Sequence, residues 1–125
     1  MTRQILVVDD DASILTVVKL SLELVAGWDV TALESAAEAI AFAESHQPEA
    51  VVLDFMMPEL DGAEVLRILR SKPATQNIPV IFLTAKAERA GHQSLKDSGA
   101  AGVLTKPFDP DTIADQIRQI LHWSD

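Results

Sequence analysis

The chain of 125 residues contains no cysteine. Disulfides, thiol catalysis and metal sites with sulfur ligands are therefore excluded. It also lacks any apolar run close to the roughly 18 residues that cross a bilayer. Residues 1–3 lead directly into a predicted strand rather than into a signal peptide. From these absences we expect a cytoplasmic protein without a membrane-spanning segment.

Basic residues are scarce. Ten lysines and arginines stand against nineteen aspartates and glutamates, which gives a formal net charge of −9. A charge of this sign opposes attraction to nucleic acid phosphates, so we expect no direct binding of DNA or RNA. An acidic surface suits a bound cation or a basic partner surface, and it also keeps a protein soluble.

Short and long apolar segments alternate along the chain. Short β-branched runs predict strands over residues 4–8, 28–33, 50–53, 78–83 and 102–105. Helical spacing predicts helices between residues 11 and 27, between 35 and 48, over about 62–71 and 88–97, and from 110 onward. This pattern predicts an α/β fold of the flavodoxin-like (βα)5 type, with a doubly wound, parallel five-stranded sheet of order 2-1-3-4-5. We expect residues 1–125 to form one domain, structured over about 3–123, with no effector domain.

Helix starts are marked by polar capping residues. Asp11, Ser35 and Asp61 each precede a predicted helix, and Ser35 and Asp61 have a glutamate three positions later, as in a capping box. Asp109 followed by Pro110 predicts the start of the last helix.

The first helix has two apolar faces. Its core face is predicted to consist of Ile14, Leu15, Val18, Leu22 and Val25. A second row, which we call the outer ridge, consists of Val17, Leu20 and Leu24. The outer ridge is expected to pack against a neighbouring helix or to bind a partner protein.

Polar residues follow four of the five predicted strands. Asp9 and Asp10 follow the first, Asp54 ends the third, Thr84 follows the fourth and Lys106 follows the fifth. In a right-handed parallel sheet these strand ends share one edge, and in the order 2-1-3-4-5 the first and third strands are neighbours. The three carboxylates are therefore expected to converge.

Crowded carboxylates repel one another unless a cation is bound or some are protonated. Oxygen ligands without histidine or cysteine favour Mg²⁺, which we assign to Asp10 and Asp54. Asp9 is expected to bind directly or through water, and a backbone carbonyl just after Asp54 is a further candidate ligand. A metal, a carboxylate nucleophile, a hydroxyl and an ammonium together suit phosphoryl transfer. Asp54 would attack phosphorus, Lys106 would offset phosphoryl charge and Thr84 would donate a hydrogen bond.

These residues stand in motifs that resemble the receiver domains of bacterial two-component response regulators, of the chemotaxis-regulator-like type. The motifs are, in order, LVVDDD, VVLDFMMPELDG, FLTA and LTKPF, and the resemblance covers Arg3 to Trp123. It implies that Asp54 accepts phosphate from a phosphohistidine on a sensor histidine kinase or histidine phosphotransfer protein. It also implies that Asp9 and Asp10 are the acidic pair for Mg²⁺, that the Met56 carbonyl is a metal ligand and that the peptide bond between residues 106 and 107 is cis.

The resemblance further implies a switch rather than a turnover enzyme. Phosphorylation would change binding to a downstream effector domain or protein, and the domain would catalyse its own phosphorylation and slow autodephosphorylation. One residue departs from the family pattern: Val103 stands where the family usually has an aromatic ring that turns inward as the threonine moves. The switch residues Thr84 and Val103 therefore cannot work through a large ring rotation in this chain.

The alternative is a receiver-like interaction module that docks partners without being phosphorylated. The valine at position 103 and the outer ridge favour it, whereas the complete set of polar site residues favours the phosphoacceptor. If the domain is phosphorylated, the outer ridge is the candidate docking surface for a helical phosphodonor.

Overall fold

The computed structural model describes residues 2–57, 60–85, 99–106 and 109–124. They contain a five-stranded parallel sheet of order β2-β1-β3-β4-β5, which confirms the predicted topology. The strands are β1 (Gln4–Val8), β2 (Asp29–Leu33), β3 (Ala50–Asp54), β4 (Val80–Ala85) and β5 (Gly102–Lys106). The three inner strands are apolar almost throughout, as is usual for strands covered on both faces.

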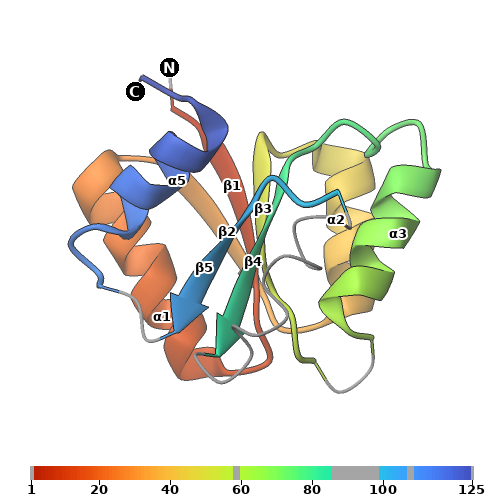
Figure 1. Cartoon of the computed structure of the whole chain (residues 1–125), viewed down its shortest axis with the longest axis horizontal. Coiled ribbons are helices and arrows are strands. Elements are labelled where there is room, and N and C mark those ends of the chain that lie inside the picture. Colours follow the sequence, from red (N-terminus) through yellow and green to blue (C-terminus); the bar gives the residue numbers. More distant parts are fainter. Residues whose placement is uncertain (1, 58–59, 86–98, 107–108, 125) are drawn as a thin grey trace.

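Helices cover both faces of the sheet. The helical segments are α1 (Ala12–Ser21), the π-helix η1 (Leu22–Ala26), α2 (Ala36–His46), α3 (Gly62–Ser71) and α5 (Ile113–Leu121). Figure 1 shows α1 and α5 on one face and α2 and α3 on the other, with both ends of the chain at the same edge of the sheet. The carboxyl ends of the strands lie together at the opposite edge.

Each face of the sheet has its own buried core. Strand residues alternate between the two cores, so that Ile81 and Leu83 face α1 and α5 whereas Val80 and Phe82 face α2 and α3. We call these the α1/α5 cluster and the α2/α3 cluster. The helices add to the first cluster Leu15, Val18, Leu22, Ile113 and Ile117, and to the second Ala36, Ala39, Ala43, Val65, Leu66 and Leu69.

Three predicted helix caps are confirmed. The side chains of Asp11, Ser35 and Asp61 accept hydrogen bonds from backbone N–H groups in the first turns of α1, α2 and α3. Each bond satisfies a donor that has no partner within the helix. Two of these caps, Asp11 and Asp61, stand in the connections that follow β1 and β3, and so give those connections a defined end.

The end of the first helix differs from the prediction. The π-helix η1 forms its last turn, and Gly27, at φ 72°, ends it as predicted. A π-helix turns less per residue than an α-helix, so Val25 does not return to the core face. Val25 is 51% exposed and Ala26 packs against the α1/α5 cluster instead. The assignment of Val25 to the core was wrong; the other predicted residues of that face do pack there, namely Ile14, Leu15, Val18 and Leu22.

Two other elements begin two or more residues later than predicted. α5 begins at Ile113, so the prediction of Asp109 as its N-cap was wrong. Asp109 caps a preceding turn instead, because its Oδ1 accepts a hydrogen bond of 2.9 Å from the N–H of Asp111. β4 begins at Val80 rather than at Ile78, whose N–H closes a turn of the preceding loop.

Two predictions lie outside the described residues, namely the helix over 88–97 and the cis bond between residues 106 and 107. Among the helices within the described ranges, none combines the length and hydropathy needed to span a bilayer.

Candidate functional site

Three charged side chains at the carboxyl edge leave the sheet on the same side. Each stands two positions after a strand residue of the α1/α5 cluster, and side chains two apart on a strand share a face. These pairs of core and charged residues are Val7 and Asp9, Val52 and Asp54, and Leu104 and Lys106. The strand pattern therefore directs two acids and one ammonium to a common position.

Lys106 forms ion pairs with both acids. Its Nζ donates a hydrogen bond of 3.2 Å to Asp54 Oδ1 and lies 3.1 Å from Asp9 Oδ2. Asp9 is fully buried and Asp54 is only 5% exposed, so both carboxylates have lost most of their hydration. Asp9 Oδ1 accepts a hydrogen bond of 2.9 Å from the N–H of Asp11, which ties the pair to the start of α1.

Burial and like charge dominate the electrostatics of Asp54. Burial, and then the negative charge of Asp9, raise the pKa of Asp54 to about 6, although Lys106 and the N–H of Met56 act in the opposite direction. Burial lowers the pKa of Lys106, but pairing with the two carboxylates outweighs burial and leaves that pKa above its ordinary value. At neutral pH the site therefore holds the Lys106 ammonium and a mainly ionised Asp54 carboxylate, which the charge of Asp9 repels.

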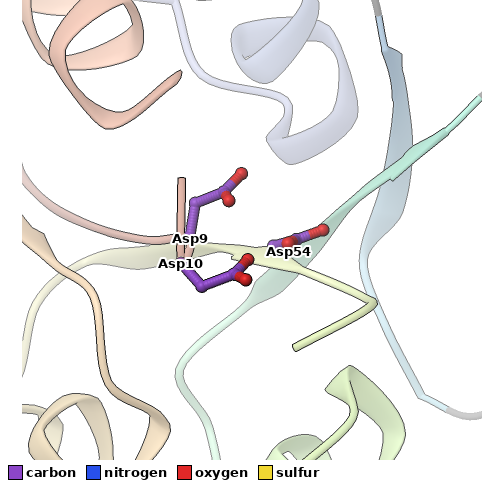
Figure 2. A group of neighbouring side chains, drawn as sticks. All are labelled: Asp9, Asp10 and Asp54. Atoms are coloured by element: carbon purple, nitrogen blue, oxygen red, sulfur yellow. The ribbon is translucent and has the colours of Figure 1, made fainter. Parts of the chain in front are cut away.

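Asp10 completes a cluster of three acids (Figure 2). One carboxylate oxygen from each of Asp9, Asp10 and Asp54 lies within 4.8 Å of the other two. An octahedral ion with bonds of about 2.1 Å joins oxygens about 3–4 Å apart, so these three need only small shifts to share one. Asp9 Oδ2 is buried and has the Lys106 ammonium 3.1 Å away, whereas Asp10 is open to solvent. A path of entry is present at Asp10, and the donors suit a hard divalent cation such as Mg²⁺.

The sequence matches the family model for the response regulator receiver domain over residues 5–118. The chain belongs to this receiver domain family. Such domains act as switches in two-component signal transduction, so the acidic cluster and Lys106 stand in the receiver domain of a response regulator.

The receiver domain is similar to several whole response regulators. It is 38% identical over 125 residues to the alkaline phosphatase synthesis transcriptional regulatory protein PhoP of Bacillus subtilis. The matched region covers 100% of this chain and 51% of that protein. It is 38% identical over 122 residues to the DNA-binding dual master transcriptional regulator RpaA of Synechocystis, covering 98% of this chain and 50% of that protein. The chain therefore spans about half the length of the curated relatives it matches.

Solved structures agree with the sequence comparison. A putative response regulator from Chloroflexus aurantiacus superposes with a TM-score of 0.89 at 29% identity, covering 98% of this chain and 99% of that chain. The chemotaxis response regulator CheY4 of Vibrio cholerae superposes with a TM-score of 0.87 at 29% identity, covering 96% and 99%. The fold of this receiver domain is thus shared along almost its whole length.

Three further predicted site residues do not join the ion pairs. Thr84 is buried at the end of β4, two positions after Phe82, so its side chain follows the opposite face of the sheet. Met56 is 59% exposed, and its N–H donates to Asp54 Oδ1 at 3.4 Å. Val103 is partly buried in the α2/α3 cluster and pairs in register with Phe82. Thr84 and Val103 therefore belong to the side of the site next to α2 and α3.

The outer ridge of this receiver domain is exposed. Val17 is 41% exposed, Leu20 49% and Leu24 82%, and Val25 beside them is 51% exposed. No helix among the described residues covers the outer ridge. Of its two predicted uses, packing against a neighbouring helix is therefore not seen in this part of the chain, and binding a partner protein stays a prediction.

Two contacts around the site were missed in the sequence. The sequence predicts that Lys106 offsets phosphoryl charge, but it does not predict the ion pair of Lys106 with Asp9. The shared spacing of both residues from core positions was the available signal. The packing of the Phe55 ring on the Phe82 ring was also missed, and nothing in the local pattern indicates it.

Proposed function

We propose that this receiver domain is a phosphoacceptor and that Asp54 is the residue phosphorylated. The observation that supports this most directly is the ammonium of Lys106 held between Asp9 and Asp54, 3.1 Å and 3.2 Å from their carboxylate oxygens, beside the exposed acid Asp10. A nucleophile, a fixed positive charge and a cluster of hard oxygen ligands are what phosphoryl transfer requires of a protein.

In the proposed reaction a carboxylate oxygen of Asp54 attacks phosphorus and forms an acyl phosphate. The bond between phosphorus and a histidine nitrogen of the donor breaks, and the donor imidazole keeps the electron pair. Because the pKa of Asp54 is raised to only about 6, the carboxylate is mainly ionised at neutral pH and able to attack. Lys106 then balances charge on the phosphoryl oxygens. Thr84, at the edge of the site next to α2 and α3, is the proposed hydrogen-bond donor to one of them.

Asp9, Asp10, Asp54 and the Met56 carbonyl are the proposed ligands of Mg²⁺. When bound, Mg²⁺ would neutralise charge on the phosphoryl oxygens and on the three acids. The protein's own part is to hold Asp9 in place, through the N–H of Asp11, and to keep Asp10 open to solvent. Slow autodephosphorylation is part of this proposal: water attacks the same phosphorus, the bond between phosphorus and the Asp54 oxygen breaks, and the Asp54 carboxylate and inorganic phosphate are released.

The proposed phosphodonor is a sensor histidine kinase or a histidine phosphotransfer protein. We place its docking surface on the outer ridge of Val17, Leu20 and Leu24, because these side chains are exposed and apolar on consecutive turns. The proposed output is altered binding to an effector domain or protein, since the similar regulators are about twice as long as this chain. With a net charge of −9, these 125 residues are not proposed to contact DNA themselves.

The test is incubation with Mg²⁺ and acetyl phosphate, followed by intact-mass measurement. Wild type is expected to gain the mass of one phosphoryl group, and Asp54→Asn to gain none. Asp115→Asn, on the exposed surface of α5, is the matched control and should label like wild type. Unlabelled wild type, or full labelling of Asp54→Asn, would contradict the proposal and leave the interaction module as the function.

A further inference from the structure

Two phenylalanine rings join the residue after Asp54 to strand β4. The rings of Phe55 and Phe82 meet edge to face, with centroids 5.3 Å apart and planes at 78°. Phe82 is fully buried in β4 and stands two positions before Thr84. The residue next to the proposed nucleophile is thus packed directly on the strand that carries the proposed hydroxyl donor.

The backbone of Phe55 joins the same strand to α3. Its N–H donates a hydrogen bond of 2.9 Å to the carbonyl of Leu83, which continues the pairing of β3 with β4 beyond Asp54. Its carbonyl accepts a hydrogen bond of 2.7 Å from the N–H of Gly62, the first residue of α3. Phe55 therefore starts the connection from β3 to α3 and also binds the residue that follows it, Gly62. Met56 lies within this connection.

Gly62 leaves no room for a side chain. A Cβ placed on Gly62 would lie 2.9 Å from Phe82 Cε1 and 3.0 Å from Phe55 Cα. The ring of Phe82 is buried and the second contact is backbone, so neither yields without a shift of the strand end or of α3. The close approach of α3 to both phenylalanines thus depends on glycine at this position.

We propose that Phe55, Phe82 and Gly62 form a clamp that positions the Asp54 carboxylate and the Met56 backbone and couples them to the end of β4. The three are positioning residues, because they act through Asp54, Met56 and β4 rather than by touching a phosphoryl group. This inference rests on the proposed function of Asp54 as phosphoacceptor.

The clamp also bears on the small side chain of Val103, where the family usually has an aromatic ring. Val103 pairs in register with Phe82 and packs into the same α2/α3 cluster. Among the described residues, Phe55, directly after β3, and Phe82 on β4 supply the ring contact beside the end of β4, whereas the β5 residue paired with Phe82 is a valine. A change at Asp54 would therefore reach β4 through the ring contact.

The test uses Phe55→Leu, which removes the ring and keeps an apolar side chain. Mg²⁺ affinity is measured by calorimetry, phosphorylation by intact mass after acetyl phosphate, and the surroundings of Met56 by NMR of ¹³C-labelled methionine methyl groups. We expect Mg²⁺ binding to weaken about 2- to 10-fold, which is what losing one aromatic pair corresponds to, with slower phosphorylation and a shifted Met56 methyl signal.

Phe42→Leu is the matched control. It removes another partly buried ring from the edge of the same cluster, one that stacks on the ring of the exposed His46 with centroids 4.2 Å apart. This variant should keep wild-type Mg²⁺ affinity and phosphorylation. Phe55→Tyr restores the ring and should recover both. Equal behaviour of Phe55→Leu and Phe42→Leu in all three measurements would overturn the clamp.

Gly62→Ala provides a second test in the same assays. We expect a larger shift of the Met56 methyl signal than for Phe55→Leu, because the added methyl group displaces backbone as well as a ring. A signal unchanged from wild type would contradict the clamp. Labelling of wild type separates the two proposals. If wild type takes up no phosphate, the proposed function fails. If wild type is labelled and Phe55→Leu equals wild type in all three measurements, only the clamp is contradicted.

Discussion

The two edges of the sheet use charged side chains in opposite ways. At the carboxyl edge, Asp9 and Asp54 are buried together and share the single ammonium of Lys106. At the amino edge, Arg3 pairs with Glu49 and its guanidinium lies 3.9 Å from the centroid of the Trp123 ring. Among the described residues, the first arrangement sets two buried acids against one ammonium, whereas the second pairs one acid with one guanidinium and adds aromatic packing.

Aromatic contacts continue inward from the amino edge. The ring of Trp123 meets that of Trp28 edge to face at 5.6 Å, and the Arg118 guanidinium lies 5.2 Å from the Trp28 centroid. These contacts join the end of the chain after α5 to the α1/α5 cluster and to the residue before β1. We infer that stability is concentrated at the amino edge, whereas the carboxyl edge carries unfavourable electrostatics that a cation or a phosphoryl group would relieve.

The largest expected effect is that of Lys106→Met at the carboxyl edge. Removing the ammonium leaves two buried carboxylates without their cation, and we expect unfolding free energy to fall by about 2–4 kcal/mol without Mg²⁺. Urea denaturation at pH 7 measures this. Added Mg²⁺ should recover part of the loss, and a variant as stable as wild type in metal-free buffer would disagree with the ion pairs described.

Trp123→Leu tests the amino edge. It removes the ring contacts with Arg3 and Trp28, and we expect a loss of about 1–3 kcal/mol in the free energy of unfolding. Calorimetry should show Mg²⁺ affinity equal to that of wild type, because the two edges do not share these contacts. A change in Mg²⁺ affinity would mean that the edges are coupled.

Asp54→Asn should raise the free energy of unfolding, in contrast to the two preceding variants. A carboxylate whose pKa is raised to about 6 is less stable in the folded protein than in the unfolded chain, and the amide removes that charge. With allowance for solvent on the open side of the site, we expect a gain of about 1–2 kcal/mol in metal-free buffer at pH 7. In Mg²⁺ the gain should shrink, because the ion stabilises only the wild type. Destabilisation in metal-free buffer would count against the electrostatic description.

The pH dependence of wild type is the smallest effect. Between about pH 4 and pH 6 the folded protein keeps a proton on Asp54 that the unfolded chain has lost, so metal-free stability should fall as pH rises through this range. The stability that the protonated Asp54 provides should be fully present below about pH 4 and fully lost above about pH 7. Comparing wild type with Asp54→Asn by urea denaturation at pH 5 and pH 7 isolates it, with an expected difference of about 1 kcal/mol. A difference that does not change with pH would exclude titration of Asp54.

Features governed by neighbouring residues were predictable from the sequence. The caps at Asp11, Ser35 and Asp61 depend on side chains two or three positions from the donors they bind, and all three were confirmed. Convergence of Asp9, Asp10 and Asp54 followed from strand order alone, because parallel strands end at one edge.

Features governed by distant packing were not predictable. Asp109 has the local pattern of a helix cap, yet it caps a turn and α5 begins only at Ile113. The Phe55 ring meets the Phe82 ring of the neighbouring strand, and the close approach of α3 to both residues depends on Gly62 having no side chain. The distance between a helix and a strand that are far apart in the sequence is set by tertiary packing. The spacing of apolar residues along one segment therefore does not predict it.

The π-helix at the end of the first helix sets which apolar residues a partner can meet. Its wider turn directs Val25 outward next to Leu24, so the exposed strip is broader than the three residues of the outer ridge. Deleting one residue from this turn should let ordinary helical winding reach Gly27 and return a side chain at this point to the interior. Changes in chain length here would thus reshape the contact surface even if composition stayed the same.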